Sequence, residues 1–117
     1  MVVMTSMSEV VIVERGGTSG TSGWGNGYVD LNKGHVLFGK SYNYLHDNYN
    51  IYVHGGLTFS ELVNGKWRIG FDTAHMGDNK ESCPKEYVLS EAYNLKKTID
   101  DIHNNSTLGK LINLVSG

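Results

Sequence analysis

The sequence predicts an α+β fold in which a small, mostly antiparallel sheet is covered by a helix packed on it near the C-terminus. Runs of β-branched and aromatic residues, separated by glycine turns, fill the first two thirds of the chain. An Asn-Gly pair at residues 64–65 joins two of these runs, as in a tight hairpin. An apolar stripe at helical spacing follows after residue 84.

Length, composition and charge narrow the classes of protein that fit. A chain of 117 residues, 39% of them hydrophobic, is predicted to form one domain over residues 1–117. The net charge of -2 gives no basis for binding bulk nucleic acid by electrostatics. The single cysteine fits a reducing compartment, and the sequence shows no run of roughly 20 apolar residues and no signal-peptide pattern. We therefore expect a cytosolic protein without a membrane partner.

The N-terminal region is predicted to contain two strands joined by a flexible connection. Residues 9–14 form a short β-branched run, which predicts a strand that residues 1–8 either extend or leave frayed. Residues 16–27 are rich in glycine and repeat Thr-Ser-Gly, so ordering them in a regular element would cost too much backbone entropy. We expect a loop over 16–27 and a second strand over 28–31.

The middle of the chain is harder to interpret. Residues 35–50 show neither a period of two nor a period of 3.6, so we expect irregular structure, with room for one helical turn. Residues 51–54 alternate in the manner of a strand and stop at two glycines.

The Asn-Gly pair at residues 64–65 predicts a type I′ hairpin, because both positions of that turn need positive φ. A two-residue turn places Leu62 opposite Trp67, and it puts the apolar residues of the two strands on opposite faces. Either both faces are covered, or a bulge reunites the apolar residues on one face, which is the interpretation we favour. The same register predicts an exposed ion pair between Glu61 and Arg68.

A helix is predicted over residues 85–104. Pro84 lies near its start, with Ser82 or Cys83 as the expected N-cap. The apolar stripe that should face the sheet consists of Val88, Ala92, Leu95, Ile99 and Ile102. A second short helix is expected over residues 108–115.

Two glycine-flanked segments, residues 54–59 and 70–78, carry polar side chains at predicted strand ends, where binding residues commonly lie. Two aromatic residues beside the glycine-rich loop add surfaces for stacking on a base, unless they simply pack on the sheet edge. The candidate ligand-binding residues are Trp24, Tyr28, His54, Thr58, Asp72, His75 and Asp78.

These segments read His-Gly-Gly-Leu-Thr-Phe and Gly-Phe-Asp-Thr-Ala-His-Met-Gly-Asp. They resemble the motifs H-G-G-L-T-[FY] and G-F-D-x-[AC]-H-x-x-D of a family of small, uncharacterised bacteriophage proteins. Residues 24–29 and the pair Gly34-His35 resemble the opening section of the same family, so the resemblance covers about residues 24–90. Where family members place prolines around that pair, this chain has Asn32 and Val36, which puts the conformation of that loop in doubt.

The resemblance implies a phage origin and a shared site, but it supplies no reaction. The site that it implies consists of His54, Thr58, Asp72, His75 and Asp78.

The same residues permit a metal site, in which Asp72, His75 and Asp78 at spacings of three are joined by His54. Mn, Fe or Zn accepts such mixed nitrogen and oxygen donors. Aspartates also cap turns routinely, so we favour a site without metal or other cofactor. The glycine-rich loop could cradle a phosphate, but it lacks the Gly-Lys-Ser/Thr ending of a P-loop, and a connector is favoured.

Two classes of function follow, and whether the chain is an enzyme stays open at this point. The favoured one is a phage-encoded protein in the host cytoplasm that captures a small polar or nucleotide-like molecule, such as a host immune signal. A homo-oligomer would help it to complete a pocket. The alternative is a small metal- or histidine-dependent hydrolase of a phosphodiester-type bond. A protein-binding inhibitor and a pair of Cys83 with His75 are further readings of the sequence.

Overall fold

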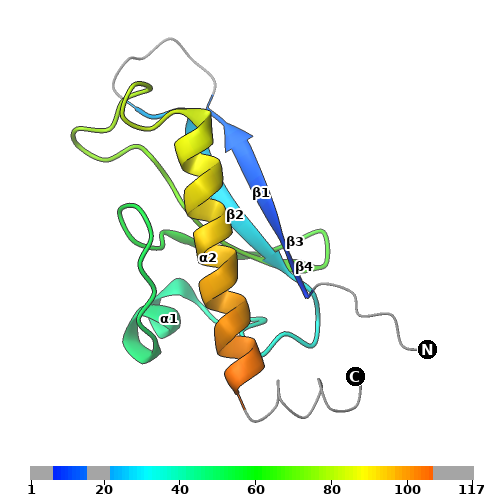
Figure 1. Cartoon of the computed structure of the whole chain (residues 1–117). Coiled ribbons are helices and arrows are strands. Elements are labelled where there is room, and N and C mark those ends of the chain that lie inside the picture. Colours follow the sequence, from blue (N-terminus) through cyan, green and yellow to red (C-terminus); the bar gives the residue numbers. More distant parts are fainter. Residues whose placement is uncertain (1–6, 16–21, 107–117) are drawn as a thin grey trace.

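The computed structural model describes residues 7–15 and 22–106, and in this part of the chain it shows the predicted α+β fold (Figure 1). Four antiparallel strands form one sheet in the order β1-β2-β4-β3. The elements are β1 (Ser8–Glu14), β2 (Gly25–Leu31), α1 (Tyr42–Asn48), β3 (Phe59–Val63), β4 (Lys66–Phe71) and α2 (Lys85–Asn105). The short helix expected over residues 108–115 lies outside the described residues.

The connection between β1 and β2 is shorter than the loop predicted over residues 16–27. β2 begins at Gly25, which pairs with Glu14, so residues 25–27 belong to the sheet. A side chain at position 25 would overlap the backbone of Val13, which explains how a glycine-rich sequence can continue as a closely paired strand. Residues 16–21 of the predicted loop lie outside the described residues.

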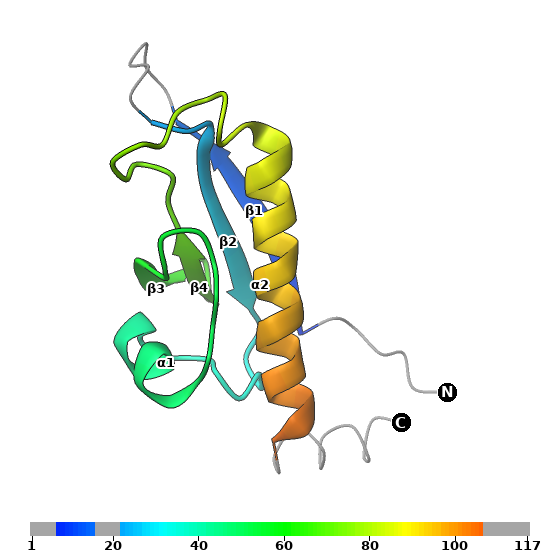
Figure 2. The same cartoon turned by 60° about the vertical axis from the view of Figure 1, so that its left-hand side comes forward.

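Helix α2 covers one face of the sheet, beside β1 and β2 (Figures 1 and 2). The predicted stripe is confirmed at four fully buried positions, namely Val88, Ala92, Leu95 and Ile99. Ile102 is half-buried, and His103 on the next position is buried in its place. Pro84 occupies the N-cap position and supplies no side-chain hydrogen bond, so the expected cap at Ser82 or Cys83 is wrong.

Residues 32–58 cross from β2 to the outer strand β3, and they cover the part of the sheet that α2 leaves open (Figure 2). Within this crossing, residues 42–48 form α1 rather than a single turn, because the Ser41 hydroxyl accepts a hydrogen bond from the Tyr44 N–H at 3.1 Å. The strand predicted over residues 51–54 is wrong. Ile51 and Leu57 are buried in the core, so the apolar alternation reflects burial of an irregular segment.

The β3–β4 hairpin has the strict two-residue register, with Leu62 opposite Trp67. Asn64 and Gly65 have φ values of 51° and 79°, as a type I′ turn requires. The favoured bulge is therefore wrong, because apolar residues are used on both faces of the sheet. Ile69 and Phe71 of β4 belong to the core. Phe59 lies on the opposite face, where its ring packs edge-on against Tyr28 with the two ring centroids 5.3 Å apart.

Arg68 forms its ion pair with Asp30 of β2 rather than with Glu61. Its Nε lies 2.7 Å from one carboxylate oxygen of Asp30, and its terminal nitrogen lies 3.0 Å from the other. Arg68 lies opposite Asp30 on one side and Glu61 on the other side of β4. Asp30 is buried and has lost the solvation of its charge, whereas Glu61 is exposed to water, so pairing with Arg68 stabilises Asp30 more. The hydrogen bond with Asp30 raises the pKa of Arg68, although burial opposes this shift.

Asp100 of α2 joins three segments at the end of the helix far from Pro84. Its carboxylate accepts hydrogen bonds from Ser8 Oγ at 2.7 Å and Lys96 Nζ at 2.6 Å, and it lies 3.3 Å from His35 Nε2. The His35 Nδ1 atom accepts the Leu37 N–H at 3.1 Å, so Nε2 carries the proton that is donated to Asp100. Burial would raise the pKa of Asp100, but these hydrogen bonds outweigh it and lower the pKa to about 2.

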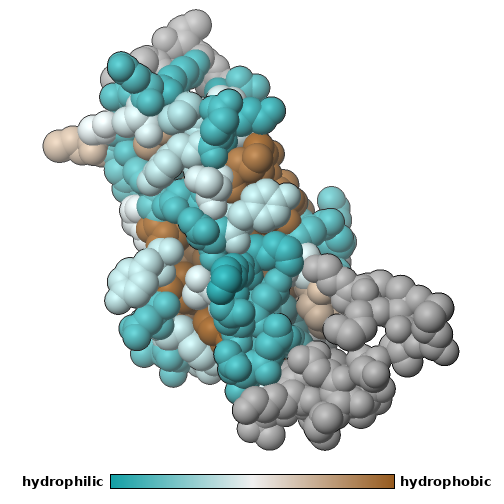
Figure 3. All heavy atoms as spheres, viewed as in Figure 1, coloured by the Kyte–Doolittle hydropathy of each residue, from teal (hydrophilic) through white to brown (hydrophobic). Residues whose placement is uncertain are grey.

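Most of the surface over α2 is hydrophilic, and smaller hydrophobic areas lie on both sides of the helix (Figure 3). Neither of the two helices in the described part of the chain has the length and apolar character that crossing a membrane demands.

Replacing Leu95 with alanine tests the packing of α2. Leu95 is 0% exposed, so the free energy of unfolding should fall by about 2–5 kcal/mol, measured by urea denaturation. Lys97→Ala is the matched control, because the Lys97 side chain is 78% exposed and its removal should cost less than about 0.5 kcal/mol. A cost below about 1 kcal/mol for Leu95→Ala would show that the stripe does not face the core.

The lowered pKa of Asp100 predicts a loss of stability in acid. A carboxyl group whose pKa is lower in the folded state stabilises the fold above its ordinary pKa of 3.8, and the contribution is lost as the pH falls through about 2. Between about pH 5 and about pH 2, the wild-type protein should therefore lose about 2 kcal/mol more stability than Asp100→Asn. Parallel pH profiles of unfolding for the two proteins would contradict this assignment.

Candidate functional site

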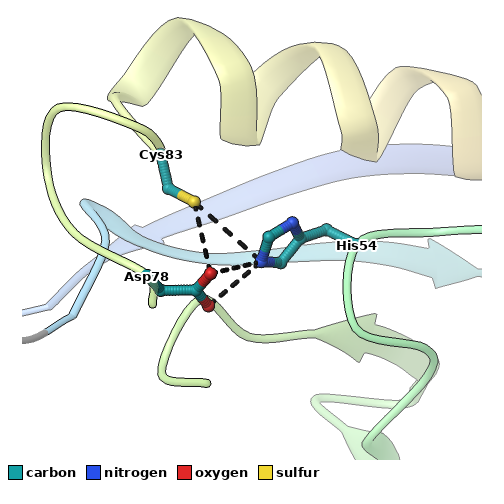
Figure 4. Close-up of side chains that lie close together, drawn as sticks. All are labelled: His54, Asp78 and Cys83. Carbon is teal, nitrogen blue, oxygen red and sulfur yellow. Dashed lines mark hydrogen bonds and ion pairs between the residues drawn. The ribbon is translucent and has the colours of Figure 1, made fainter. Parts of the chain in front are cut away.

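A connected set of polar side chains lies beside the first turns of α2, where the turn at His54 meets the loop after β4 (Figures 1 and 4). We call this set the polar network. Its members are His54, Thr58, Asp72, His75, Asp78, Cys83, Tyr87 and Glu91.

Asp78 is the main acceptor of the polar network. Its two carboxylate oxygens lie 2.9 and 3.0 Å from His54 Nε2, and one of them also accepts the His75 N–H at 3.0 Å. His75 Nδ1 lies 3.2 Å from the same oxygen. Burial would raise the pKa of Asp78, but the hydrogen bonds from His54 and from the His75 backbone outweigh it and hold the pKa below its ordinary value. Asp78 is therefore ionised at neutral pH, and His54 Nε2 donates to it.

α2 fixes His54 from the other side. Tyr87 Oη lies 2.8 Å from His54 Nδ1, and Glu91 accepts the His54 backbone N–H at 2.9 Å. With Nε2 as a donor to Asp78, Nδ1 accepts the tyrosine proton. Burial raises the pKa of Tyr87, and the charge of Glu91 adds to the effect. Both ring nitrogens of His54 are thus engaged.

His75, Asp72 and Thr58 form the more exposed part of the polar network. Thr58 Oγ1 donates to Asp72 at 3.1 Å, and His75 Nδ1 lies 3.6 Å from Asp72. The His75 side chain is 38% exposed, and its Nε2 makes no hydrogen bond to the described residues. The His75 ring lies against Gly55, where a Cβ atom would come within 2.6 Å of Nε2. Gly55 also has a φ of 67°, so both the space and the backbone require glycine here.

Thr73 holds the loop that carries Asp72, His75 and Asp78. Its side chain is fully buried, and its hydroxyl donates to the Gly25 carbonyl at 2.6 Å. The Thr73 carbonyl accepts the Gly23 N–H at 2.7 Å. The loop is thereby fixed to the start of β2.

The structure brings five of the predicted site residues together: His54, Thr58, Asp72, His75 and Asp78. Tyr28 does not join them, because Gly27 faces Ala92 of α2 and the next residue along the strand points to the opposite face. Trp24 is half-buried against the core, with Lys85 5.9 Å from the centre of its ring. Neither aromatic residue belongs to the polar network.

Sequence reasoning did not include three members of the polar network: Cys83, Tyr87 and Glu91. Tyr87 and Glu91 each precede a residue of the apolar stripe, and their spacing of four puts both on the same side of α2. That offset is the signal by which they could have been found. Cys83 had been considered as a partner of His75, whereas the structure places its sulfur 3.9 Å from His54 Nε2.

Cys83 lies at the inner end of the polar network. It is 2% exposed, and its Sγ lies 3.7 Å from Asp78 Oδ1. Burial raises the pKa of the Cys83 thiol, and the charge of Asp78 adds to the shift. Such a thiol is a poor nucleophile at neutral pH. Together, His54, Asp78 and Cys83 offer three metal-binding atoms within 4.8 Å of one another, a set that differs from the predicted one of His54, Asp72, His75 and Asp78.

The burial and raised pKa of Cys83 predict that the native protein resists thiol reagents. In the presence of a chelator, reaction with Ellman's reagent should be slower by at least about 100-fold than for the same protein in urea. Because Cys83 is the single cysteine of the chain, the absorbance change reports on this position alone. Similar rates in the native and unfolded proteins would show that the thiol is accessible and activated.

Comparisons with protein-family models, with curated proteins and with solved structures find no match to this chain. The resemblance to small bacteriophage proteins therefore stays a prediction from the two motifs. The function has to be argued from the geometry of the polar network itself.

Proposed function

We propose that the chain is a binding protein that captures a small polar or nucleotide-like molecule at the exposed side of the polar network. Asp72, His75 and Thr58 are the members that a ligand meets first, because they are more exposed than Asp78 and Cys83. Carboxylates of this kind accept hydrogen bonds from ribose hydroxyls, and His75 Nε2 offers a further polar contact. The resemblance adds the context of a phage protein, and in that context we propose a host immune signal in the host cytoplasm as the captured molecule.

One observation carries the choice of a binder over an enzyme. Each group that could act as a nucleophile or base at the centre of the network is already engaged or unreactive. The Cys83 thiol is buried with a raised pKa, and His54 uses both ring nitrogens in hydrogen bonds to Tyr87 and Asp78. An arrangement of this kind positions groups for contact, whereas nucleophilic catalysis needs an activated nucleophile beside a free base.

The hydrolase alternative is favoured by a different observation. His75 has an acidic partner on each side of its Nδ1 atom and an exposed ring, as a general base oriented by a carboxylate would have. In that reading, Asp72 and Asp78 would orient His75 for proton transfer from water. Recovery of altered ligand is the outcome that would support it.

Two exposed hydrophobic side chains support a homo-oligomer as the functional form. Tyr52, which is 83% exposed, lies just before His54, and Met76, which is 103% exposed, lies just after His75. Large hydrophobic side chains at the edge of a polar site are suited to contact with a second copy that closes the site.

The proposal predicts capture without conversion. Purified protein is incubated with a panel of signalling nucleotides, and the unbound fraction and the heat-released material are both analysed by chromatography and mass spectrometry. One nucleotide should be depleted from solution and recovered intact after heating. His75→Ala and Asp72→Ala should each weaken its binding by tenfold or more, which corresponds to about 1.4 kcal/mol.

Asp47→Ala and Lys97→Ala are the matched controls, since both side chains are exposed and lie outside the polar network. They should leave the affinity unchanged. Failure of the wild-type protein to deplete any member of the panel would count against the proposal. Release of a cleaved product that His75→Ala no longer forms would replace it with the hydrolase.

A further inference from the structure

The inner end of the polar network places three different metal-binding atoms around one point (Figure 4). His54 Nε2 lies 2.9 Å from Asp78 Oδ1, and Cys83 Sγ lies 3.9 Å from the first atom and 3.7 Å from the second. Zinc ligands at 2.0–2.3 Å in a tetrahedral site are separated by about 3.3–3.6 Å from one another. An ion could enter with shifts of roughly 0.5 Å or less in these separations.

The chemical types of the three donors fit a transition metal. A thiolate and an imidazole are ligands that Zn²⁺ accepts readily and that Mg²⁺ and Ca²⁺ avoid, while a carboxylate completes many zinc sites. Cys83 and Asp78 are both buried, and burial of a thiol beside a carboxylate gains little otherwise, because S–H is a weak donor. Asp78 and Cys83 lie five residues apart in the loop before α2, whereas His54 comes from a segment 24 residues before Asp78. Local turn geometry therefore does not account for the approach of His54 to the other two.

The surroundings of His54 supply an independent argument. Metal binding needs the lone pair of Nε2, which puts the ring proton on Nδ1, and Tyr87 Oη stands 2.8 Å from Nδ1 to accept it. Tyr87 can then turn its own proton to Glu91 Oε1 at 3.5 Å. Histidines that bind zinc almost always donate their second ring N–H to a hydrogen-bond acceptor, and Tyr87 Oη is in position to be that acceptor here.

Asp78 is oriented in the same way. Its Oδ2 atom accepts the His75 N–H at 3.0 Å and lies 3.2 Å from His75 Nδ1, which leaves Oδ1 on the side of His54 and Cys83. The ligand oxygen and the ligand nitrogen are therefore each fixed by a residue that is not itself in the group of three.

We propose that His54, Asp78 and Cys83 bind a zinc ion or a similar divalent transition-metal ion. Three protein ligands leave one tetrahedral position for water or for a captured molecule. On binding, the ring proton of His54 moves from Nε2 to Nδ1, and the Cys83 thiol gives up its proton to become the thiolate ligand. Binding therefore releases one proton per ion, from the Cys83 thiol.

Cobalt(II) titration tests this site directly, because cobalt replaces zinc in such sites and gives visible absorption. Untagged, chelator-treated protein should bind one Co²⁺ per chain, with tetrahedral d–d bands and a thiolate-to-cobalt charge-transfer band. The band can come from one sulfur alone, since the chain contains a single cysteine. Zn²⁺ should abolish the bands, and one proton should be released per ion in weakly buffered solution.

Cys83→Ser is expected to lose the charge-transfer band, and Asp78→Asn should weaken Co²⁺ binding by tenfold or more. Asp47→Asn and Lys97→Ala, at exposed positions outside the polar network, are the matched controls and should keep both the band and the stoichiometry. Circular dichroism checks that each variant is folded. The proposal is rejected if folded wild-type protein shows no thiolate band, or if Cys83→Ser binds cobalt with unchanged affinity and spectrum.

The metal site and the proposed capture of a small molecule can fail separately. Stoichiometric Co²⁺ binding through Cys83, without depletion of any nucleotide, leaves the metal site standing and rejects the binder. If chelator-treated protein captures a nucleotide but shows no thiolate band when Co²⁺ is added, the binder stands and the metal site is rejected.

Discussion

The close contact of α2 with the sheet is the constraint on which the other features depend. Gly27 makes this contact possible, because a Cβ atom there would lie 2.6 Å from the ring of Phe71 and 3.3 Å from Ala92. The missing side chain lets helix and strand approach while the apolar stripe closes the core. The same approach brings the first turns of α2 to His54. Tyr87 and Glu91 can reach that histidine because a buried stripe beside them fixes the rotation of the helix.

Three carboxylates join parts of the chain that are distant in sequence. Asp30 joins β2 to β4 through Arg68, and Asp100 joins α2 to β1 and to the segment at His35. Asp78 has the same kind of position between two loops, but its partners are mainly histidines. The first two have a lysine or arginine as a permanent counter-charge, whereas Asp78 is surrounded by groups that can exchange protons or accept an ion. Because of this difference, we regard Asp30 and Asp100 as structural residues and Asp78 as a candidate functional residue.

The sequence predicted those features that depend on local spacing. The α2 stripe and the turn at residues 64–65 were both confirmed, since helical periodicity and positive φ are properties of neighbouring residues. The strand over residues 51–54 failed because Ile51 is buried without a strand partner, which alternation cannot reveal. The bulge failed for a related reason, since Phe59 of β3 packs on the face opposite to Ile69 and Phe71 of β4. Five members of the polar network were predicted from two motifs. Cys83 joins them through tertiary packing that no local pattern records, whereas the position of Tyr87 beside the apolar stripe could have indicated it.

The position of the β3–β4 hairpin has a consequence for how the protein folds. β4 lies between β2 and β3, so the sheet is complete only when the hairpin has paired with β2 across the long crossing of residues 32–58. Residues 54–58 lie just before this hairpin and residues 72–78 lie just after it. The pairing of β4 with β2 therefore brings both of these segments of the polar network into place. A partly folded chain that contains only β1 and β2 has no polar network. The site therefore exists only in molecules in which β2 has paired with β4, the strand pairing that joins the segments most distant in sequence.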